Sequence, residues 1–133
     1  DLPLSIRRQR QMCIRDSPHA VAVDDRDRVL VADRENRRVQ VFDVDGRFLE
    51  EWAHVGYPYG LTIAPDGTPW LTDARHERIL HLDRDGTVLG RYGGVHGKAA
   101  GQLGFVHGIA VTSSGAVLVG EVLNWRLQRL DLR

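Results

Sequence analysis

The sequence is poor in the residues that mark several common classes of protein. It has a single cysteine, Cys13, among 133 residues, which excludes an internal disulfide and a zinc site built from cysteines. Lys98 is its only lysine, and its 18 basic residues are balanced by 18 acidic ones. The net charge of zero gives no overall attraction to nucleic acid or to an anionic membrane surface. No apolar run approaches the roughly 18 residues of a membrane-spanning helix.

What is present is typical of a single globular domain. The length suits one domain of about 100–150 residues, and 42% hydrophobic with 27% charged residues is usual for such a domain. Fourteen glycines predict many tight turns. No segment has a 3.6-residue hydrophobic period of helical length. The composition and the pattern therefore favour an all-β fold.

The first 17 residues differ from the rest of the chain. Residues 11–17, Gln-Met-Cys-Ile-Arg-Asp-Ser, resemble the translation of a sequencing adapter. We therefore expect residues 1–17 to be a non-native segment that is excluded from reasoning about the fold. The alternative is a native but disordered N-terminal arm. On the first interpretation, the native N-terminus lies outside this sequence.

From residue 18 onwards the sequence aligns with itself. An apolar pentad begins each of three copies, at 19–23, 59–63 and 107–111, so the offsets are 40 and 48 residues. Each pentad is followed by a turn, a second short strand, a polar turn and a third strand. The first two copies continue through an Asp-Gly hairpin turn, in which Gly tolerates a positive φ, into a fourth strand. The predicted strands are 19–23, 29–32, 38–42 and 48–52, then 59–63, 70–72, 78–82 and 88–92, then 107–111, 117–120 and 126–130.

Four short antiparallel strands repeated at this spacing are typical of a propeller blade. We therefore predict an all-β partial β-propeller with blades at about 18–56, 57–104 and 105–133. The extra residues of the second copy fall in the glycine-rich connection 93–104. No helix follows that connection, so a phosphate-binding loop is not expected there.

One stretch of the first copy carries a more specific pattern. Residues 31–46 read Val-Ala-Asp, then Asn-x-Arg-Val-Gln-Val-Phe-Asp, then Asp-Gly. This pattern resembles the NHL repeat family of β-propellers, and the resemblance covers residues 18–133. It implies a ring of about six blades, of which this chain supplies about three, and fewer than four blades cannot close a ring. The missing blades of a parent protein would then be its partners, and the chain alone would be inactive.

Internal repetition separates scaffold residues from candidates for chemistry. An acidic residue at the end of the second strand and an arginine five positions later recur in all three copies, and we expect them to pair across the turn. Asn36 and Asn124 recur as turn-forming residues. The recurring pairs are Asp33 with Arg38, Asp73 with Arg78, and Glu121 with Arg126.

Four residues break the repeat: His19, Arg34, Tyr59 and His107. In an antiparallel meander the start of the first strand and the end of the second lie on one rim, and the first strand of a blade normally lines the central channel. His19 and His107, from two blades that are not neighbours, should therefore converge near Arg34. Such a set can hold a metal and an anionic substrate. The alternative is that each imidazole only hydrogen-bonds a neighbouring turn.

The other four histidines and the three tryptophans are not candidates for the functional site. We expect the remaining four histidines to lie on the surface. The three tryptophans should pack in the core or between blades. The histidines are His54, His76, His81 and His96, and the tryptophans are Trp52, Trp70 and Trp125.

A narrower resemblance concerns the dipeptide Pro18-His19 and the sequence Val-Ala-Asp-Arg-Glu-Asn at 31–36. Together they resemble peptidylglycine α-amidating lyase (peptidyl-α-hydroxyglycine lyase) and its bacterial relatives, in which three histidines from alternate blades hold a zinc ion in the channel. The resemblance implies that His19 and His107 are metal ligands and that Arg34 is catalytic. Tyr59 would belong to a blade that contributes no ligand and would line the substrate rim. The third histidine and the catalytic tyrosine of the family would lie in blades outside this sequence.

The same resemblance implies a reaction and a location. Peptides ending in α-hydroxyglycine would lose a C–N bond and give an amide and glyoxylate, in an extracellular or periplasmic setting. Phe105 and Val106 depart from the family, which has Met and Pro before its later histidine. Two alternatives stay open: a non-catalytic NHL propeller that binds protein, glycan or cell-wall material, and a calcium-dependent lactonase-like hydrolase. Calcium prefers oxygen ligands, so His, Tyr and His at the inner-strand positions argue against the second alternative.

Overall fold

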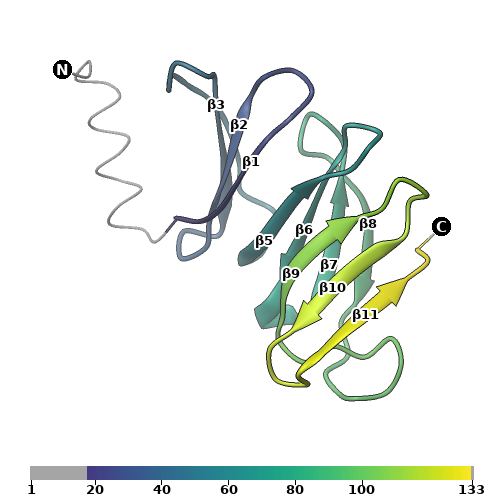
Figure 1. Cartoon of the computed structure of the whole chain (residues 1–133). Coiled ribbons are helices and arrows are strands. Elements are labelled where there is room, and N and C mark those ends of the chain that lie inside the picture. Colours follow the sequence, from purple (N-terminus) through teal and green to yellow (C-terminus); the bar gives the residue numbers. More distant parts are fainter. Residues whose placement is uncertain (1–17, 133) are drawn as a thin grey trace.

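Residues 18–132, which the computed structural model describes, form three antiparallel β-sheets that follow one another along the chain (Figure 1). The interpretation of residues 1–17 lies outside this part of the chain. Each sheet is a meander in which neighbouring strands are consecutive in sequence. We name the sheets blade 1 (β1–β4), blade 2 (β5–β8) and blade 3 (β9–β11). The predicted all-β fold is confirmed.

The predicted strands are all present, with small changes at their ends. The second strand of each blade runs one residue further, because its acidic residue is still paired across the ladder with the arginine that begins the third strand. The strands are β1 (Pro18–Val23), β2 (Val29–Asp33), β3 (Arg38–Phe42), β4 (Phe48–Trp52), β5 (Pro58–Ile63), β6 (Pro69–Asp73), β7 (Arg78–Leu82), β8 (Val88–Gly93), β9 (Val106–Val111), β10 (Val117–Glu121) and β11 (Arg126–Leu130).

Helical structure is almost absent from the described residues. A single 3₁₀ turn, η1 (Ala74–His76), connects β6 to β7. No helix within residues 18–132 has the length and apolar character needed to cross a membrane.

A buried carboxylate closes the second strand of every blade. All three acidic side chains are buried, and each accepts a hydrogen bond from the arginine five positions later. A carboxylate without its partner would be strongly destabilising at such a position, so the ion pair fixes the turn between the second and third strands. The pairs are Asp33–Arg38, Asp73–Arg78 and Glu121–Arg126, with nitrogen–oxygen distances of 2.7, 3.0 and 2.5 Å.

The hairpin turns between the third and fourth strands repeat one arrangement. The Asp43 carboxylate accepts hydrogen bonds from the backbone amides of Asp45 and Arg47, both at 2.9 Å. Gly46 follows with a φ of +86°, a conformation that glycine adopts without strain. Asp83 makes the equivalent pair of bonds in blade 2, at 2.8 and 2.9 Å. The predicted Asp-Gly turns are confirmed.

The hydrophobic core lies between blades. One cluster joins blades 1 and 2, around Leu30, Val41, Trp52, Leu71 and Leu80. A second cluster joins blades 2 and 3. Since burial of one large apolar side chain contributes about 1.5–3 kcal/mol, each blade depends on its neighbour for stability. The second cluster contains Ala64, Trp70, Ile79, Leu103, Val106, Val117 and Val119.

The tryptophan prediction is correct for two residues and wrong for the third. Trp52 and Trp70 are buried between blades, but Trp125 is 94% exposed. It occupies the turn position with positive φ that Arg37 and Glu77 occupy in the other blades. The same position holds an exposed side chain in blade 1, Arg37, and a largely covered one in blade 2, Glu77, which accepts hydrogen bonds from the Phe105 amide.

The first strands of the three blades, β1, β5 and β9, lie next to one another (Figure 1). Gly60 in β5 lets the next blade approach closely, because a Cβ atom at this position would collide with the carbonyl oxygen of His107. Thr72 donates a hydrogen bond to that same oxygen at 2.9 Å and accepts one from the Gly60 amide at 2.8 Å. Backbone contacts therefore set the spacing of the inner strands.

The Glu121 carboxylate should give blade 3 a stability that depends on pH. Burial raises the pKa of Glu121, but hydrogen bonds from Arg126, Asn124 and Gln128 outweigh burial and lower it from 4.5 to about 2. A carboxyl with a lowered pKa stabilises the fold above its unfolded-state value, and this contribution is lost as pH falls through the folded-state value. In urea denaturation, we expect the unfolding free energy of the wild type to fall more steeply between about pH 4.5 and pH 2 than that of Glu121→Gln.

At pH 7, Glu121→Gln should unfold with about 1–3 kcal/mol less free energy than the wild type, because the Arg126 guanidinium loses its charged partner. Asp45→Asn, in an exposed turn, is the matched control and should keep the wild-type slope. Parallel pH profiles for the wild type and Glu121→Gln would contradict the assignment.

Candidate functional site

Three rings from three blades meet at the start of the inner strands. His19, Tyr59 and His107 occupy equivalent positions in β1, β5 and β9. The ring centres of His19 and His107 are 4.7 Å apart, and those of Tyr59 lie 5.3 Å from His19 and 5.6 Å from His107. The sequence predicts that the two imidazoles converge, and the structure places them in contact.

The orientation of the His19 ring is fixed by the backbone. Its Nδ1 donates a hydrogen bond to the carbonyl oxygen of Tyr59 at 3.0 Å. The proton is therefore on Nδ1 in the neutral ring, and Nε2 keeps its lone pair. Metal-binding histidines commonly have this arrangement, with one nitrogen held by a carbonyl and the other free to coordinate.

The His107 ring is half-buried and lies near His19 and Arg34. Burial lowers its pKa below the ordinary 6.5, and the neighbouring His19 and Arg34 lower it further. An imidazole with a lowered pKa is neutral at physiological pH. It is then available as a ligand or as a proton acceptor.

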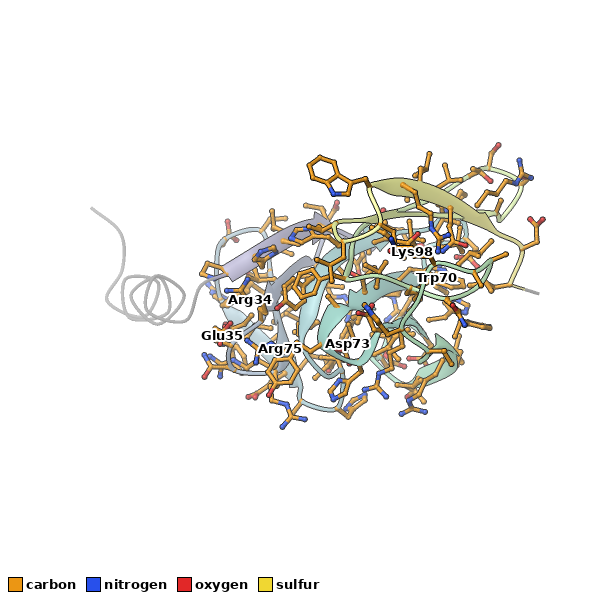
Figure 2. All side chains as sticks on the ribbon, turned by 90° about the horizontal axis from the view of Figure 1, so that it is seen from below. Arg34, Glu35, Trp70, Asp73, Arg75 and Lys98 are labelled. Carbon is orange, nitrogen blue, oxygen red and sulfur yellow. The ribbon has the colours of Figure 1, made fainter. Side chains whose placement is uncertain are left out.

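Arg34 lies at the edge of the three rings. Its guanidinium carbon is 5.1 Å from the centre of the Tyr59 ring, within the range of a cation–π contact. Its Nε donates to the Glu35 carboxylate at 2.8 Å. Figure 2 shows Arg34, Glu35 and Arg75 together on this rim.

Glu35 and Arg75 were not among the candidates drawn from the sequence. The Arg75 side chain reaches across from blade 2, with one terminal nitrogen 3.5 Å from Glu35 and with Nε donating to the Tyr59 hydroxyl at 3.4 Å. The bridge joins residues 40 positions apart. One signal could have found it: Glu35 and Arg75 occupy the same repeat position with opposite charge.

Two neutral imidazoles make up part of a ligand set that zinc can use. Zinc–nitrogen bonds are about 2.0–2.1 Å long, so two imidazoles on one ion have their coordinating nitrogens within about 4 Å of each other. The ring centres of His19 and His107 are 4.7 Å apart, so the two rings would share one ion only with their free nitrogens turned toward each other. Within residues 18–132, no group of three or more His, Cys, Asp and Glu side chains could hold a metal ion. Glu121 belongs to its own hydrogen-bond network.

The other histidines have more structural roles than the surface prediction allowed. His76 takes the place of the turn asparagine in blade 2, and its Nδ1 lies 2.6 Å from the Asp73 carboxylate. His81 is half-buried, and its ring stacks on Trp70 with the ring centres 4.1 Å apart. Burial lowers the pKa of His81. The surface prediction is therefore wrong for His81, which a neighbouring indole covers.

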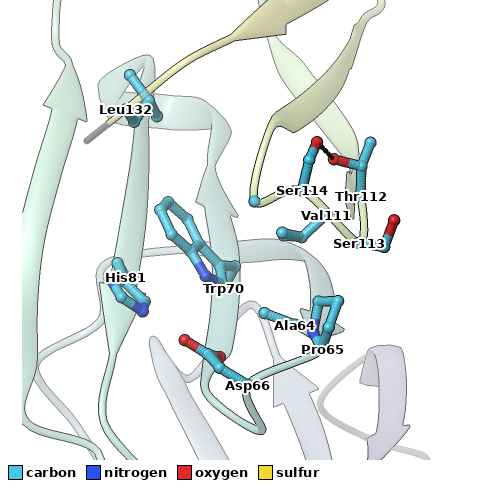
Figure 3. A pocket seen from close by; sticks show the side chains of 11 residues that line it. Ala64, Pro65, Asp66, Trp70, His81, Val111, Thr112, Ser113, Ser114 and Leu132 are labelled. Atoms are coloured by element: carbon cyan, nitrogen blue, oxygen red, sulfur yellow. Dashed lines mark hydrogen bonds between the residues drawn. The ribbon is translucent and has the colours of Figure 1, made fainter.

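His81 and Trp70 also line a hollow of about 310 Å³ between blades 2 and 3 (Figure 3). Asp66, Ser113 and Ser114 supply polar groups at its edge. Thr68 links Asp66 to His81 through its hydroxyl, at 2.6 and 2.8 Å. The hollow lies beside the turns that follow β5 and β9, so it is separate from the rim that carries His19.

Comparison with known proteins identifies the repeat. The family model of the NHL repeat matches residues 16–42. The match includes β1, β2 and β3 of blade 1. Protein lin-41 of Caenorhabditis elegans is 56% identical over 34 residues, which are 26% of this chain and 3% of that protein. Human NHL repeat-containing protein 3 is 44% identical over 54 residues, which are 38% of this chain and 16% of that protein.

The fold matches solved propellers over most of the chain. A catalytically inactive histidine-to-alanine variant of virginiamycin B lyase from Staphylococcus aureus, with quinupristin, has a TM-score of 0.66 at 17% identity, covering 88% of this chain and 42% of that one. A gluconolactonase from Xanthomonas campestris has a TM-score of 0.62 at 19% identity, covering 77% and 34%. The predicted partial NHL-type propeller is confirmed. The chain spans less than half the length of each of these proteins.

Removing the charge of Arg34 should raise the pKa of His107 in the metal-free protein, because the Arg34 guanidinium is one of the neighbouring groups that lower it. NMR titration of the imidazole Hε1 signals in Arg34→Gln and in the wild type measures the change. Arg91→Gln, on the exposed side of β8, is the matched control and should leave the His107 titration unchanged. An identical midpoint in Arg34→Gln and wild type would show that the guanidinium does not act on His107.

Proposed function

We propose that this NHL chain contributes two zinc ligands and an anion-binding arginine to a lyase-type active site in a propeller channel. The observation that carries the proposal is the contact between the His19 and His107 rings, 4.7 Å apart, from two non-adjacent blades. The substrates would be peptides that end in α-hydroxyglycine, as the resemblance to the amidating lyases implies.

The ligand assignment rests on the chemistry of the two imidazoles. His19 is held through Nδ1 and offers Nε2, and His107 has a lowered pKa that keeps it neutral. Neutral imidazoles are common zinc ligands, and a catalytic zinc needs three protein ligands with one position open. The third ligand would come from blades outside this chain.

Each residue of the site would have a distinct part in the reaction. Bound zinc would supply Lewis-acid polarisation of the substrate oxygens. Arg34 would bind the terminal carboxylate with charge-assisted hydrogen bonds, and the same charge would stabilise negative charge that develops on oxygen. Tyr59 and Phe105, whose rings pack 5.0 Å apart, would form an apolar wall beside the peptide. Loss of the hydroxyl proton and cleavage of the C–N bond would give the amide and glyoxylate.

A binding function without catalysis is supported by a different feature of the same rim. The Tyr57 ring has two guanidinium groups over it, those of Arg37 at 4.9 Å and Arg75 at 4.3 Å. Arginine and tyrosine are the residues that dominate recognition of protein partners. Calcium suits the inner position less well than zinc, since the ring nitrogens of His19 and His107 are not the oxygen ligands that calcium prefers.

Titration with Co²⁺ or Zn²⁺ tests the ligand assignment directly. We expect His19→Ala and His107→Ala each to weaken binding to the chain by at least about tenfold. The Co²⁺ absorption bands should be lost with the affinity. His96→Ala, in an exposed connection, is the control and should bind like the wild type. Equal metal content in wild type and His107→Ala would exclude His107 as a ligand.

Binding of a peptide that ends in α-hydroxyglycine tests the role of Arg34. The zinc-loaded chain should bind it, and Arg34→Gln should bind about tenfold more weakly, because a hydrogen bond to a charged group is lost. Calorimetry with the wild type, Arg34→Gln and the control Arg91→Gln gives the comparison. The chain by itself should release no glyoxylate, since the third ligand and the base would lie in other blades. Unchanged affinity in Arg34→Gln, or measurable glyoxylate, would contradict the proposal.

A further inference from the structure

The junction between blades 1 and 2 carries arginines gathered around one aromatic ring. The Tyr57 ring, just before β5, is half-buried, and the guanidinium carbons of Arg37 and Arg75 lie 4.9 and 4.3 Å from its centre. Both blades that supply these side chains are described, so the arrangement does not depend on where the chain begins or ends. A guanidinium that stacks on a ring keeps its N–H edges available and loses little freedom when it binds a further partner.

The junction has more positive than negative charge at its surface. Arg37 and Arg75 are both exposed. The Glu35 carboxylate is shared between Arg34 and Arg75. The buried carboxylates that close β2 and β6 already hold the arginines of their own turns. Exposed guanidiniums in excess over carboxylates favour an anionic partner.

Glu35 shows which kind of anion the junction accepts. Its Oε1 accepts a hydrogen bond from Arg34 at 2.8 Å and lies 3.5 Å from a terminal nitrogen of Arg75, so a carboxylate fits between guanidiniums of two blades (Figure 2). The contact with Arg75 is long for a hydrogen bond, and the side chains of Arg75 and Glu35 are 45% and 43% exposed. A carboxylate from a partner can therefore replace Glu35 at Arg75.

We propose that this junction binds a peptide segment rich in aspartate and glutamate, and that Glu35 is the internal competitor of the bound carboxylates. A segment that crosses Tyr57 would place acidic side chains on Arg37 and Arg75. Nucleic acid fits less well, because its affinity comes from many cations along the phosphate backbone and this chain has no net positive charge. The inference gives a partner to the binding surface around Tyr57 and needs neither zinc nor the lyase reaction.

Fluorescence anisotropy of the metal-free chain measures the binding of a peptide of alternating Asp and Gly, labelled at its N-terminus and amidated at its C-terminus. The peptide has no terminal carboxylate, so the result is independent of the lyase assignment. Arg37→Gln and Arg75→Gln should each weaken binding about threefold, and the double variant about tenfold. Arg91→Gln, on the exposed side of β8, is the control and should bind like the wild type. Tyr57→Phe keeps the ring and should also bind like the wild type, whereas Tyr57→Leu should weaken binding.

Glu35→Gln gives a result that a merely structural role would not produce. Loss of the internal competitor should strengthen binding of the acidic peptide about threefold, because Arg75 loses its own carboxylate partner. Circular dichroism checks that the sheets remain in each variant. The proposal is overturned if the wild type does not bind the peptide or binds an Asn-Gly version equally well. Unchanged or weaker binding in Glu35→Gln, or tighter binding of a single-stranded RNA of equal charge, overturns it too.

Discussion

The buried ion pair at the end of each second strand is the interaction on which the rest of the structure depends. In blade 1 the Asp33 carboxylate holds Arg38 and the Asn36 amide, and this fixes the turn that reverses the chain. The backbone of Asp33 lies opposite Pro18 in the β1–β2 ladder, next to an irregular step in the register. The pair therefore also determines where the inner strand begins, and His19 is the next residue. The same register holds in blades 2 and 3. The buried acid–arginine pair of each blade therefore positions its ring on the same rim.

The sequence was sufficient for the fold because each blade is specified by short-range signals. Alternating apolar residues, Asp-Gly turns and the acid–arginine spacing all act within one blade. The apolar pattern and the acid–arginine spacing recur in all three blades, and the Asp-Gly turn recurs in two. The failures were at positions where the local pattern gives no direction for a side chain. Trp125 has the large apolar side chain of a core residue, yet it lies in a turn and is exposed to solvent. His81 has the polarity of a surface residue, yet an indole from the neighbouring strand covers it.

The convergence of the candidate side chains was predictable in part for a different reason. His19, Arg34, Tyr59 and His107 were found because they break a repeat, and a repeat makes exceptions visible. The link between Glu35 and Arg75 was missed because it is a contact between blades, and no spacing within one copy encodes it. The lowered pKa of His107 could not be predicted from the sequence, since it depends on burial and on the approach of His19 and Arg34 in the folded chain.

The residues that stabilise a blade are not the residues that form its candidate site, and this separation has an evolutionary consequence. The residues that hold a blade together lie at the ends of β2 and β3 and in the hairpin turns, whereas the ring-bearing position is the second residue of the inner strand. That position holds histidine in blades 1 and 3 and tyrosine in blade 2, although the ion pairs at the ends of the second strands are alike. A substitution at the inner position can therefore change the chemistry of the rim while the buried ion pairs keep the blade folded. Duplication of a blade supplies another such position at once, which makes this architecture a ready source of new sites.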